Sequence, residues 1–251
     1  MAKSKVLIYC QSTYGFGHID RTMAIAKTLR EKFDVYLIYG GAIPERLFDR
    51  VEFKIIRLPT IREDRWGSLR AEHEEANLSK VFERRRRIIL EAYNKIKPNV
   101  VIVEHYPFGR RLFEQEIFPI LEASKKDKTF RSITISSIRD ILGTKYDHEW
   151  TMSVANHLFD AVFVHADYRY VRDLNEPYLS EDLNTPVHYT GYVVPYSGLA
   201  LTKKEGKYIL ITGGGGRSSV GVYNAAIEYC KNNHDQNRSG IHIVAGPYFF
   251  K

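Results

Sequence analysis

The sequence predicts an α/β fold built on a parallel sheet with helices packed against it. Short, continuous apolar runs, such as residues 99–104 and 160–164, are typical of strands that are covered on both faces. Segments with helical spacing of apolar residues separate these runs, and this alternation favours parallel strands joined by right-handed crossovers. Glycine-rich turns follow two of the apolar runs and lead into helical segments. These three observations together indicate the fold class.

The expected elements of the first part of the chain alternate in regular order. The strands cover residues 5–10, 34–39, 51–57, 99–104, 130–136 and 160–164. The helices lie near residues 17–32, 76–97, 110–124, 145–158 and 168–174.

Residues 191–207 interrupt this alternation. The segment holds Pro195, several glycines and a short charge cluster, which are typical of a linker between domains. The pattern then restarts with a strand, the glycine turn "TGGGGRSS", a helix and one further strand. We therefore expect a first domain over residues 1–195, a linker over residues 196–206, and the opening β-α-β unit of a second domain over residues 207–251.

Composition narrows the class of protein. The 251 residues are 44% hydrophobic and 27% charged, which is an ordinary globular mixture. No apolar run is long enough to span a bilayer, and the N-terminus lacks a secretory hydrophobic segment. Two cysteines form no disulfide framework. We expect a cytoplasmic protein.

The net charge of +7 has two interpretations. It can serve solubility alone, or it can favour an anionic ligand such as a nucleotide, a lipid phosphate or a membrane surface. The sequence holds no zinc-ligand spacing, RNP-type aromatic motif or helix-turn-helix signature, so nucleic acid is not an expected partner. It also holds no D-x-D pair that would bind a metal ion, so neither a metal nor another cofactor is expected.

The segment "TYGFGHIDR" forms the turn between the first expected strand and helix. Gly15 and Gly17 shape this turn, and His18 begins the helix, where free backbone N–H groups favour anions. Asp20 stands where the dinucleotide fingerprint needs a third glycine, and "TGGGGRSS" lacks the lysine of a P-loop. Glycine turns also occur in parallel sheets for backbone reasons alone.

Polar residues gather where the expected strands end. Because the carboxyl ends of parallel strands share one edge of a sheet and ligands bind beyond that edge, these residues are candidates for a site. Strand ends are also polar simply because loops are solvated, so the combination of acid, base and guanidinium carries more weight than any one residue. The candidates are His18, Glu104, His105, Arg139, Asp140, His165 and Asp167.

His18 is the strongest candidate of this group. A helix N-terminus disfavours positive charge, so the imidazole is expected to be neutral and able to accept a proton from a hydroxyl near pH 7. The glycines beside it would let a substrate approach closely. The alternative is a helix-start residue that hydrogen-bonds a neighbouring loop, and both interpretations stay open.

Four consecutive arginines, Arg84–Arg87, lie in the helix expected near residues 76–97. On a helix they form a tight spiral, so they cannot all face one ligand. We interpret them as a solvent-exposed face. Contact of one or two of them with a phosphate or a membrane is the alternative.

A series of motifs runs along nearly the whole chain. They are "YGFGHIDRTMAIAKTLRE", "FKIIRLPTI", "VVIVEHYPFGRR", "SSIRDIL", "FVHAD", "YTGYV" and "ILITGGGG". In this order and spacing they resemble predicted bacterial glycosyltransferases with two Rossmann-like domains, the GT-B fold. These enzymes are distant relatives of the N-acetylglucosaminyl transferase that completes lipid II.

The resemblance implies that the N-terminal domain binds the sugar acceptor and that the C-terminal domain binds a nucleotide-sugar, the co-substrate. By position, His18 matches the histidine that lines the cleft in the lipid II enzyme, and Glu104 and Asp140 match acidic positions that follow strands in the predicted family. These three are the expected catalytic residues. The glycine turn of the second domain would face the donor diphosphate. The expected substrate-binding residues are Gly15, Gly17, Arg139, Gly213, Gly214, Gly215 and Gly216.

Two departures from the family bear on the substrates. Asp20 and Arg21 replace a proline-containing segment of the lipid II enzyme, which leaves the acceptor class open, with lipid-linked or anionic acceptors and peripheral membrane contact among the candidates. Such enzymes also hold the nucleotide with a later glycine and glutamate, whereas this chain ends at Lys251. We expect an incomplete donor site that a further C-terminal half or a partner chain would complete.

The expected reaction is direct transfer of a sugar from a nucleotide-sugar to an acceptor hydroxyl. His18 would be the general base, Glu104 would orient it or share that role, and the backbone amides of Gly213–Gly216 would stabilise the leaving diphosphate. One alternative is a nucleotide-sugar epimerase or hydrolase on the same fold. Another is a non-catalytic acceptor-binding subunit or fragment. The sequence leaves the sugar, the nucleotide, the acceptor and the oligomeric state open.

Overall fold

The computed structural model describes residues 3–13, 15–42, 48, 51–64, 66–72, 77–126, 130–140, 147–175, 182–194, 208–214, 219–232 and 240–246. The chain divides into two compact units. The first comprises Met1–Thr13 and His18–Pro195, and the second comprises Tyr14–Gly17 and Tyr196–Lys251. The linker expected over residues 196–206 lies outside the described residues.

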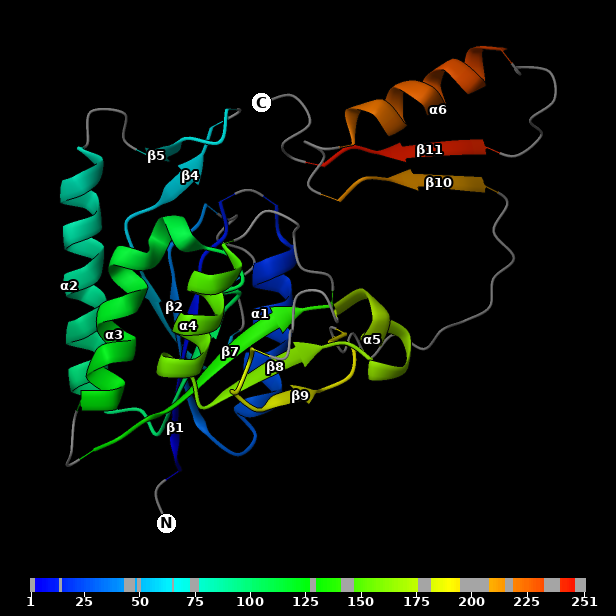
Figure 1. The fold of residues 1–251 in the computed structure, drawn as a ribbon. Coiled ribbons are helices and arrows are strands. Elements are labelled where there is room, and N and C mark those ends of the chain that lie inside the picture. Colours follow the sequence, from blue (N-terminus) through cyan, green and yellow to red (C-terminus); the bar gives the residue numbers. More distant parts are fainter. Residues whose placement is uncertain are drawn as a thin grey trace. The chain divides into compact units, whose positions relative to one another are not determined.

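The first unit is built on a seven-stranded sheet in the order β3-β2-β1-β6-β7-β8-β9 (Figure 1). Every neighbouring pair in this sheet is parallel, so the predicted fold class is confirmed. The strands are β1 (Lys5–Cys10), β2 (Asp34–Tyr39), β3 (Lys54–Arg57), β6 (Val100–Glu104), β7 (Ile133–Arg139), β8 (Ala161–His165) and β9 (Val187–Tyr189).

Helices cover both faces of this sheet (Figure 1). On one face, residues of α2, α3 and α4 share a buried core with Leu7, Tyr9 and Val101 of the central strands. On the other face lies α1, which buries Ile19 and Met23. The helices of this unit are α1 (Gly17–Leu29), α2 (Leu78–Ile96), the short 3₁₀ helix η2 (Arg111–Phe113), α3 (Glu114–Lys126), α4 (His148–Leu158) and α5 (Tyr168–Asn175).

The strands β1 and β6 are neighbours, although β2 to β5 lie between them in the chain. From β1 the sheet grows in one direction, to β2 and β3, and from β6 it grows in the other direction, to β9. The strand order therefore reverses between β1 and β6. In open parallel sheets, ligands bind beyond the carboxyl ends of the strands at such a switch point.

The strand β7 lies three residues further along than the predicted 130–136. Pairing with β6 begins at Ile133, opposite Val100. The strand continues through two buried serines because each has a hydrogen-bond partner: Ser136 donates to the carbonyl of Tyr106, and Ser137 lies 2.7 Å from Nε2 of His165. Buried polar residues can occupy a strand when their hydrogen bonds are made inside the protein. Such residues interrupt the apolar run, so the bounds of the strand cannot be predicted from hydropathy alone.

Two further features were not predicted. Strand β9 closes the far edge of the sheet, and a small antiparallel hairpin joins β4 (Ile61–Glu63) to β5 (Leu69–Ala71). Asp64 shapes the hairpin turn, because its carboxylate accepts the backbone N–H groups of Trp66 and Ser68 at 2.9 Å each. These strands are only three residues long, which is too short for a periodic signal.

The interpretation of Arg84–Arg87 as a solvent-exposed face is wrong for Arg85. Its side chain is fully buried and lies on the face of α2 that also buries Phe82 and Ile89. Nη2 and Nε of Arg85 donate to the two carboxylate oxygens of Glu116 in α3, at 2.6 and 2.7 Å. The hydroxyl of Tyr9 in β1 also donates to Glu116. A paired charge can therefore occupy a core position at helical spacing from apolar residues.

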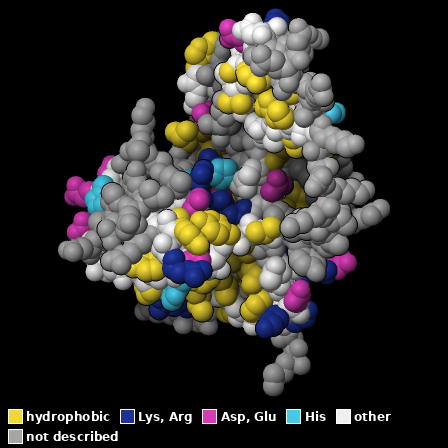
Figure 2. Space-filling model, turned by 90° about the vertical axis from the view of Figure 1, so that its right-hand side faces the viewer, with side chains coloured by type: hydrophobic (Ala, Val, Ile, Leu, Met, Phe, Trp, Pro, Cys, Tyr) yellow, Lys and Arg dark blue, Asp and Glu magenta, His cyan; other side chains and the backbone are white. Residues whose placement is uncertain are grey.

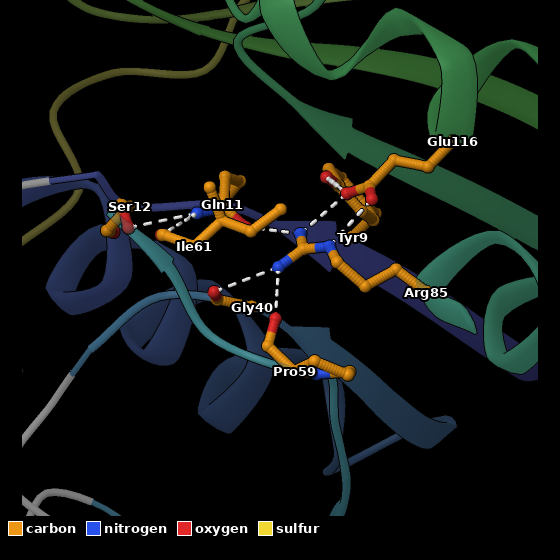
Figure 3. Close-up of polar contacts among 8 residues, drawn as sticks. All are labelled: Tyr9, Gln11, Ser12, Gly40, Pro59, Ile61, Arg85 and Glu116. Atoms are coloured by element: carbon orange, nitrogen blue, oxygen red, sulfur yellow. Dashed lines mark hydrogen bonds and ion pairs between the residues drawn. The ribbon is translucent and has the colours of Figure 1, made fainter. Parts of the chain in front are cut away.

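The same guanidinium connects the loops at the carboxyl edge of the sheet (Figure 3). It donates to Oε1 of Gln11 at 2.6 Å, and to the carbonyls of Pro59 at 2.6 Å and Gly40 at 3.1 Å. Gln11 in turn donates to the carbonyl of Ile61. A Cβ at Gly40 would collide with the Arg85 guanidinium. The network thus fixes the segment that follows β1 to the segments that follow β2 and β3.

The second unit contains β10 (Tyr208–Thr212), α6 (Val220–Asn232) and β11 (Gly240–Val244). The strands β10 and β11 pair in parallel, as expected of a β-α-β unit. Apolar side chains on both strands stay exposed among the described residues: Leu210 is 55% and Val244 is 53% exposed. Among the described residues of this unit, the small sheet therefore has apolar side chains that no other element covers.

Candidate functional site

His18 and Glu104 meet at the switch point of the sheet. Nδ1 of His18 lies 2.7 Å from Oε1 of Glu104. His18 is the second residue of α1, which follows β1, and Glu104 is the last residue of β6. Glu104 is 1% exposed, whereas His18 is 23% exposed. Two of the predicted site residues thus come together across the two strands that flank the switch point.

Arg21 is a further member of this cluster, and the sequence analysis missed it as a site residue. It follows His18 by three residues in α1, so the two side chains lie on one face of the helix. Nη2 of Arg21 pairs with the same oxygen of Glu104. The helical spacing from His18 is the signal that could have found it.

The Glu104 carboxyl is ionised at neutral pH. Burial by itself would raise its pKa, but the hydrogen bond with His18 and the positive charges around it, including Arg110, lower the pKa to about 2. An ionised carboxylate only accepts hydrogen bonds, so Nδ1 of His18 is the donor in this pair. In the neutral form of the ring, the lone pair is therefore on Nε2. Among the described residues, Nε2 of His18 has no hydrogen-bond partner.

Two other histidines of the predicted group surround this pair. Burial lowers the pKa of His105 to about 3 and the pKa of His165 to about 4, so both rings are neutral at pH 7. His165 lies between the hydroxyls of Ser137 and Thr190, 2.7 Å from each. The ring centroid of His105 lies 5.5 Å from that of His18. Both His18 and His105 have a ring nitrogen without a partner among the described residues, but Nδ1 of His105 is itself buried, whereas the side chain of His18 is 23% exposed.

Several buried polar atoms close to Glu104 lack a hydrogen-bond partner within the described part of the chain. They are Nε of Arg21, Oε2 of Glu104, Nδ1 of His105 and Nε of Arg110. Buried polar groups in folded proteins are nearly always paired with protein, water or ligand. Their concentration beside the His18–Glu104 pair therefore marks a place where a bound molecule or water would complete the hydrogen bonding.

Arg139 and Asp140 lie at the same edge of the sheet, two strands away from β1. Arg139 ends β7 opposite His165, and its Nε lies 3.6 Å from Oδ1 of Asp140. Within the described ranges, no hydrogen bond or ion pair joins either residue to His18 or Glu104. A catalytic role for Asp140 and a binding role for Arg139 stay predictions. Asp167, at the end of β8, pairs with Arg169 instead.

The first glycine turn is open around its glycines. Gly15 has a φ of +78°, a left-handed conformation that favours glycine. No atom of the described residues lies within 4 Å of the position that a Cβ would take at Gly15 or at Gly17. The turn therefore has room for a ligand, and the binding roles of both glycines stay predictions.

In the second glycine turn, the amide of Gly213 is already engaged. Its N–H donates to the hydroxyl of Tyr223 at 2.8 Å, and that hydroxyl donates to the carbonyl of Val244. Gly213 thus ties β10, α6 and β11 together. Gly214 has a φ of +59°, which favours glycine. Gly215 and Gly216 lie outside the described residues.

Charge and hydropathy across the described residues are mixed. Figure 2 shows one face on which basic, acidic and histidine side chains lie next to one another among hydrophobic ones, so the net positive charge does not form a uniformly basic surface there. No described helix is both long and apolar enough to cross a membrane. No group of three or more described His, Cys, Asp or Glu side chains is placed to hold a metal ion.

No family model and no curated protein matches the sequence. Solved structures do match the fold. A glycosyltransferase from Rickettsia africae is 13% identical with a TM-score of 0.57, and the match covers 99% of this chain and 69% of that one. UGT2 of Phytolacca americana, solved with UDP-2-fluoro-glucose and pterostilbene, is 12% identical with a TM-score of 0.56, over 98% of this chain and 72% of that one.

A UDP-N-acetylglucosamine 2-epimerase from Rickettsia bellii is also similar. It is 13% identical with a TM-score of 0.54, and the match covers 98% of this chain and 62% of that one. The chain thus spans between 62% and 72% of the length of these three proteins. Identities this low carry information on the fold alone. The chain has the α/β, Rossmann-like fold of GT-B glycosyltransferases and related epimerases, as its motifs predicted.

Proposed function

We propose that the protein transfers a sugar from a nucleotide-sugar to an acceptor hydroxyl. One observation carries this proposal: the buried, ionised Glu104 holds Nδ1 of His18 and leaves Nε2 open at the switch point of a parallel sheet. A histidine oriented in this way accepts a proton from a hydroxyl near pH 7. The fold shared with glycosyltransferases supports the same reaction class.

In the proposed reaction, Nε2 of His18 takes the proton of the acceptor hydroxyl while its oxygen attacks the anomeric carbon of the donor. The bond between that carbon and the diphosphate oxygen breaks, and the nucleoside diphosphate leaves with the electron pair. The imidazolium that forms carries a positive charge next to the carboxylate of Glu104. Because Glu104 is already ionised and fixed, it stabilises this charge without reorganising.

Arg21 has a supporting part in this proposal. It pairs with the oxygen of Glu104 that also accepts from His18. The guanidinium restricts the carboxylate to one orientation, and the carboxylate in turn restricts the imidazole. A ring held by a second group in this way meets the geometric demand on a general base.

The donor would bind through the glycine turn of the second unit. Gly214 and the neighbouring Gly215 and Gly216 stay the proposed contacts of the diphosphate, because free N–H groups in glycine turns bind anions. Since the amide of Gly213 donates to Tyr223, we propose that Gly213 shapes this turn. Metal-independent transfer in the cytoplasm remains part of the proposal.

An epimerase or a hydrolase is the second candidate, because a UDP-N-acetylglucosamine 2-epimerase shares the fold. The test uses the protein as its gene encodes it, with UDP-, dTDP- and GDP-sugars at millimolar concentration. Nucleoside diphosphate release is measured with and without a panel of hydroxyl acceptors. Acceptor-dependent release supports transfer. Equal release without acceptor indicates a hydrolase, and a changed sugar on an intact nucleotide indicates an epimerase.

A further inference from the structure

A pocket of about 390 Å³ lies in the first unit, next to the turn that joins β6 to η2. The loop after β1 contributes Thr13, and the start of α4 contributes Thr151. The turn itself contributes Arg110, and η2 contributes Arg111 and Leu112. The pocket therefore combines basic, hydroxyl and apolar groups close to the carboxyl ends of β1 and β6.

The two adjacent arginines of this pocket differ in their partners. Arg111 lies 3.1 Å from a carboxylate oxygen of Asp147 and stacks over the ring of Trp150, with 4.3 Å between its Cζ and the ring centroid. The Arg110 side chain makes no hydrogen bond or ion pair with any described residue, and its Nε is buried. A guanidinium with a buried, unpaired N–H group is costly unless a ligand or water accepts from it.

The backbone holds Arg110 in an unusual conformation. Its φ is +62°, in the left-handed region that residues other than glycine seldom adopt. Such conformations persist where the surrounding structure enforces them, and they are frequent at ligand sites. The preceding residue, Gly109, is tightly packed, because the ring of His105 lies so close that a Cβ on Gly109 would collide with it.

A second unpaired group lies in the same pocket. Thr151 is fully buried, and its Oγ1 has no hydrogen-bond partner among the described residues. Two carboxylates also line the pocket. One of them, Asp147, caps α4 and accepts hydrogen bonds from Arg111 and from the backbone N–H of Trp150. The other is Glu63. Arg110 is thus the charged group of the pocket whose hydrogen bonds are open within the described part of the chain.

We propose that Arg110, with the hydroxyls of Thr13 and Thr151, binds an oxyanion of the acceptor, either a phosphate or a carboxylate. Guanidinium groups bind both in a bidentate manner. The turn that carries Arg110 begins at Glu104, and its His105 lies beside the ring of His18. An acceptor held by its acidic group at Arg110 would extend toward His18. That this ligand is the acceptor rests on the proposed function, whereas the oxyanion site itself does not depend on it.

The simpler alternative is that Arg110 only balances the charge of Glu104. Binding experiments separate the two, because a charge-balancing arginine gives no anion selectivity. The probes are glycerol 3-phosphate, glycerate and neutral glycerol, measured by calorimetry on the full chain. We expect millimolar binding of at least one of the two anions and none of glycerol. The stronger of the two anions identifies the acidic group, and no binding of either overturns the proposal.

Variants link the binding to the pocket. We expect R110Q to weaken anion binding by roughly tenfold, while R86Q, which removes an exposed arginine from α2, leaves it within about twofold. If R110Q fails to fold, T151V removes the unpaired hydroxyl and should weaken binding severalfold. Unchanged binding in R110Q, or in T151V if that variant has to replace it, overturns the proposal.

The same experiment separates this inference from the proposed function. H18A should keep anion binding, since His18 is not a lining residue of the pocket. Anion binding without any sugar transfer would contradict the proposed function alone. Transfer to neutral acceptors without anion binding would contradict the oxyanion site alone.

Discussion

Nδ1 of His18 donates to Oε1 of Glu104 over 2.7 Å, and this bond joins the start of α1 to the end of β6. Those two elements flank the point where the strand order of the sheet reverses. The bond therefore connects the two halves of the sheet at its ligand-binding edge. It also decides which ring nitrogen of His18 is left for a substrate.

Removing the imidazole tests the proposed general base. If Nε2 of His18 accepts the acceptor proton, H18A should lower the transfer rate by about 10²–10⁴-fold, the usual contribution of such a group. The measurement is acceptor-dependent release of nucleoside diphosphate. H157A is the matched control, because His157 is an exposed histidine on α4 whose Nδ1 bonds the carbonyl of Ser153 in the same helix. A loss of less than threefold in H18A would reject the catalytic role.

Replacing Glu104 tests the link between its charge and folding. Its pKa in the folded protein is about 2, below the ordinary value of 4.5. The carboxylate therefore contributes stability that is fully present above pH 4.5 and is lost as the pH falls toward 2. From the size of this shift, the free energy of unfolding of E104Q at pH 7 should be about 3 kcal/mol lower than that of the wild type.

The pH dependence distinguishes this effect from a simple packing defect. The stability difference between wild type and E104Q should shrink below pH 4.5, as urea unfolding at a series of pH values would measure. E91Q is the control, because Glu91 lies 70% exposed on α2. A difference that stays constant down to the lowest accessible pH would show that Glu104 acts through packing alone.

The buried pair of Arg85 and Glu116 makes a separate prediction about stability. R85M leaves the Glu116 carboxylate buried without its cation, so it should lower the free energy of unfolding by about 3–5 kcal/mol. The double variant R85M/E116M places two apolar groups in the same space and should recover part of that loss. R86M, at the exposed next position, should change stability by no more than about 0.5 kcal/mol. A double variant as unstable as R85M would contradict this account of the pair.

The sequence predicted the sheet well where strands are apolar throughout. The strands β1 and β2 have the predicted bounds of 5–10 and 34–39, because both are buried along most of their length. The bounds of β7 were displaced because Ser136 and Ser137 are polar but satisfied by tertiary partners. Arg85 was misplaced for the same reason, since a sequence does not show that Glu116 of another helix neutralises it.

Part of the candidate site followed from one general rule. Residues at the carboxyl ends of parallel strands share an edge, and this rule brought His18 and Glu104 onto one short list. The rule does not give strand order, however. Only the adjacency of β1 and β6 makes these two residues neighbours, whereas Asp140 follows β7, one strand further along. Arg110 was not on the list, because its unpaired guanidinium depends on how the turn after β6 folds.

The second glycine turn offers few contacts for the nucleotide-sugar donor. The turn "TGGGGRSS" can hold a diphosphate through free backbone N–H groups, but one of those groups, the amide of Gly213, is already bonded to Tyr223. The resemblance to GT-B enzymes also implies that further residues, beyond a β-α-β unit of this kind, hold the base and the ribose. Without those residues the turn contacts the diphosphate alone, and we expect weak affinity. The hydrogen bonds that the diphosphate gains from a solvated turn largely replace those that it already makes with water. Calorimetry of the 251-residue chain with UDP-, dTDP- and GDP-sugars should therefore show no binding tighter than the millimolar range.

R217Q, which removes the one charged side chain of this turn, should weaken any residual binding severalfold, whereas K231Q at the end of α6 should not. Micromolar binding of any of these nucleotide-sugars would show that the donor site lies within residues 1–251.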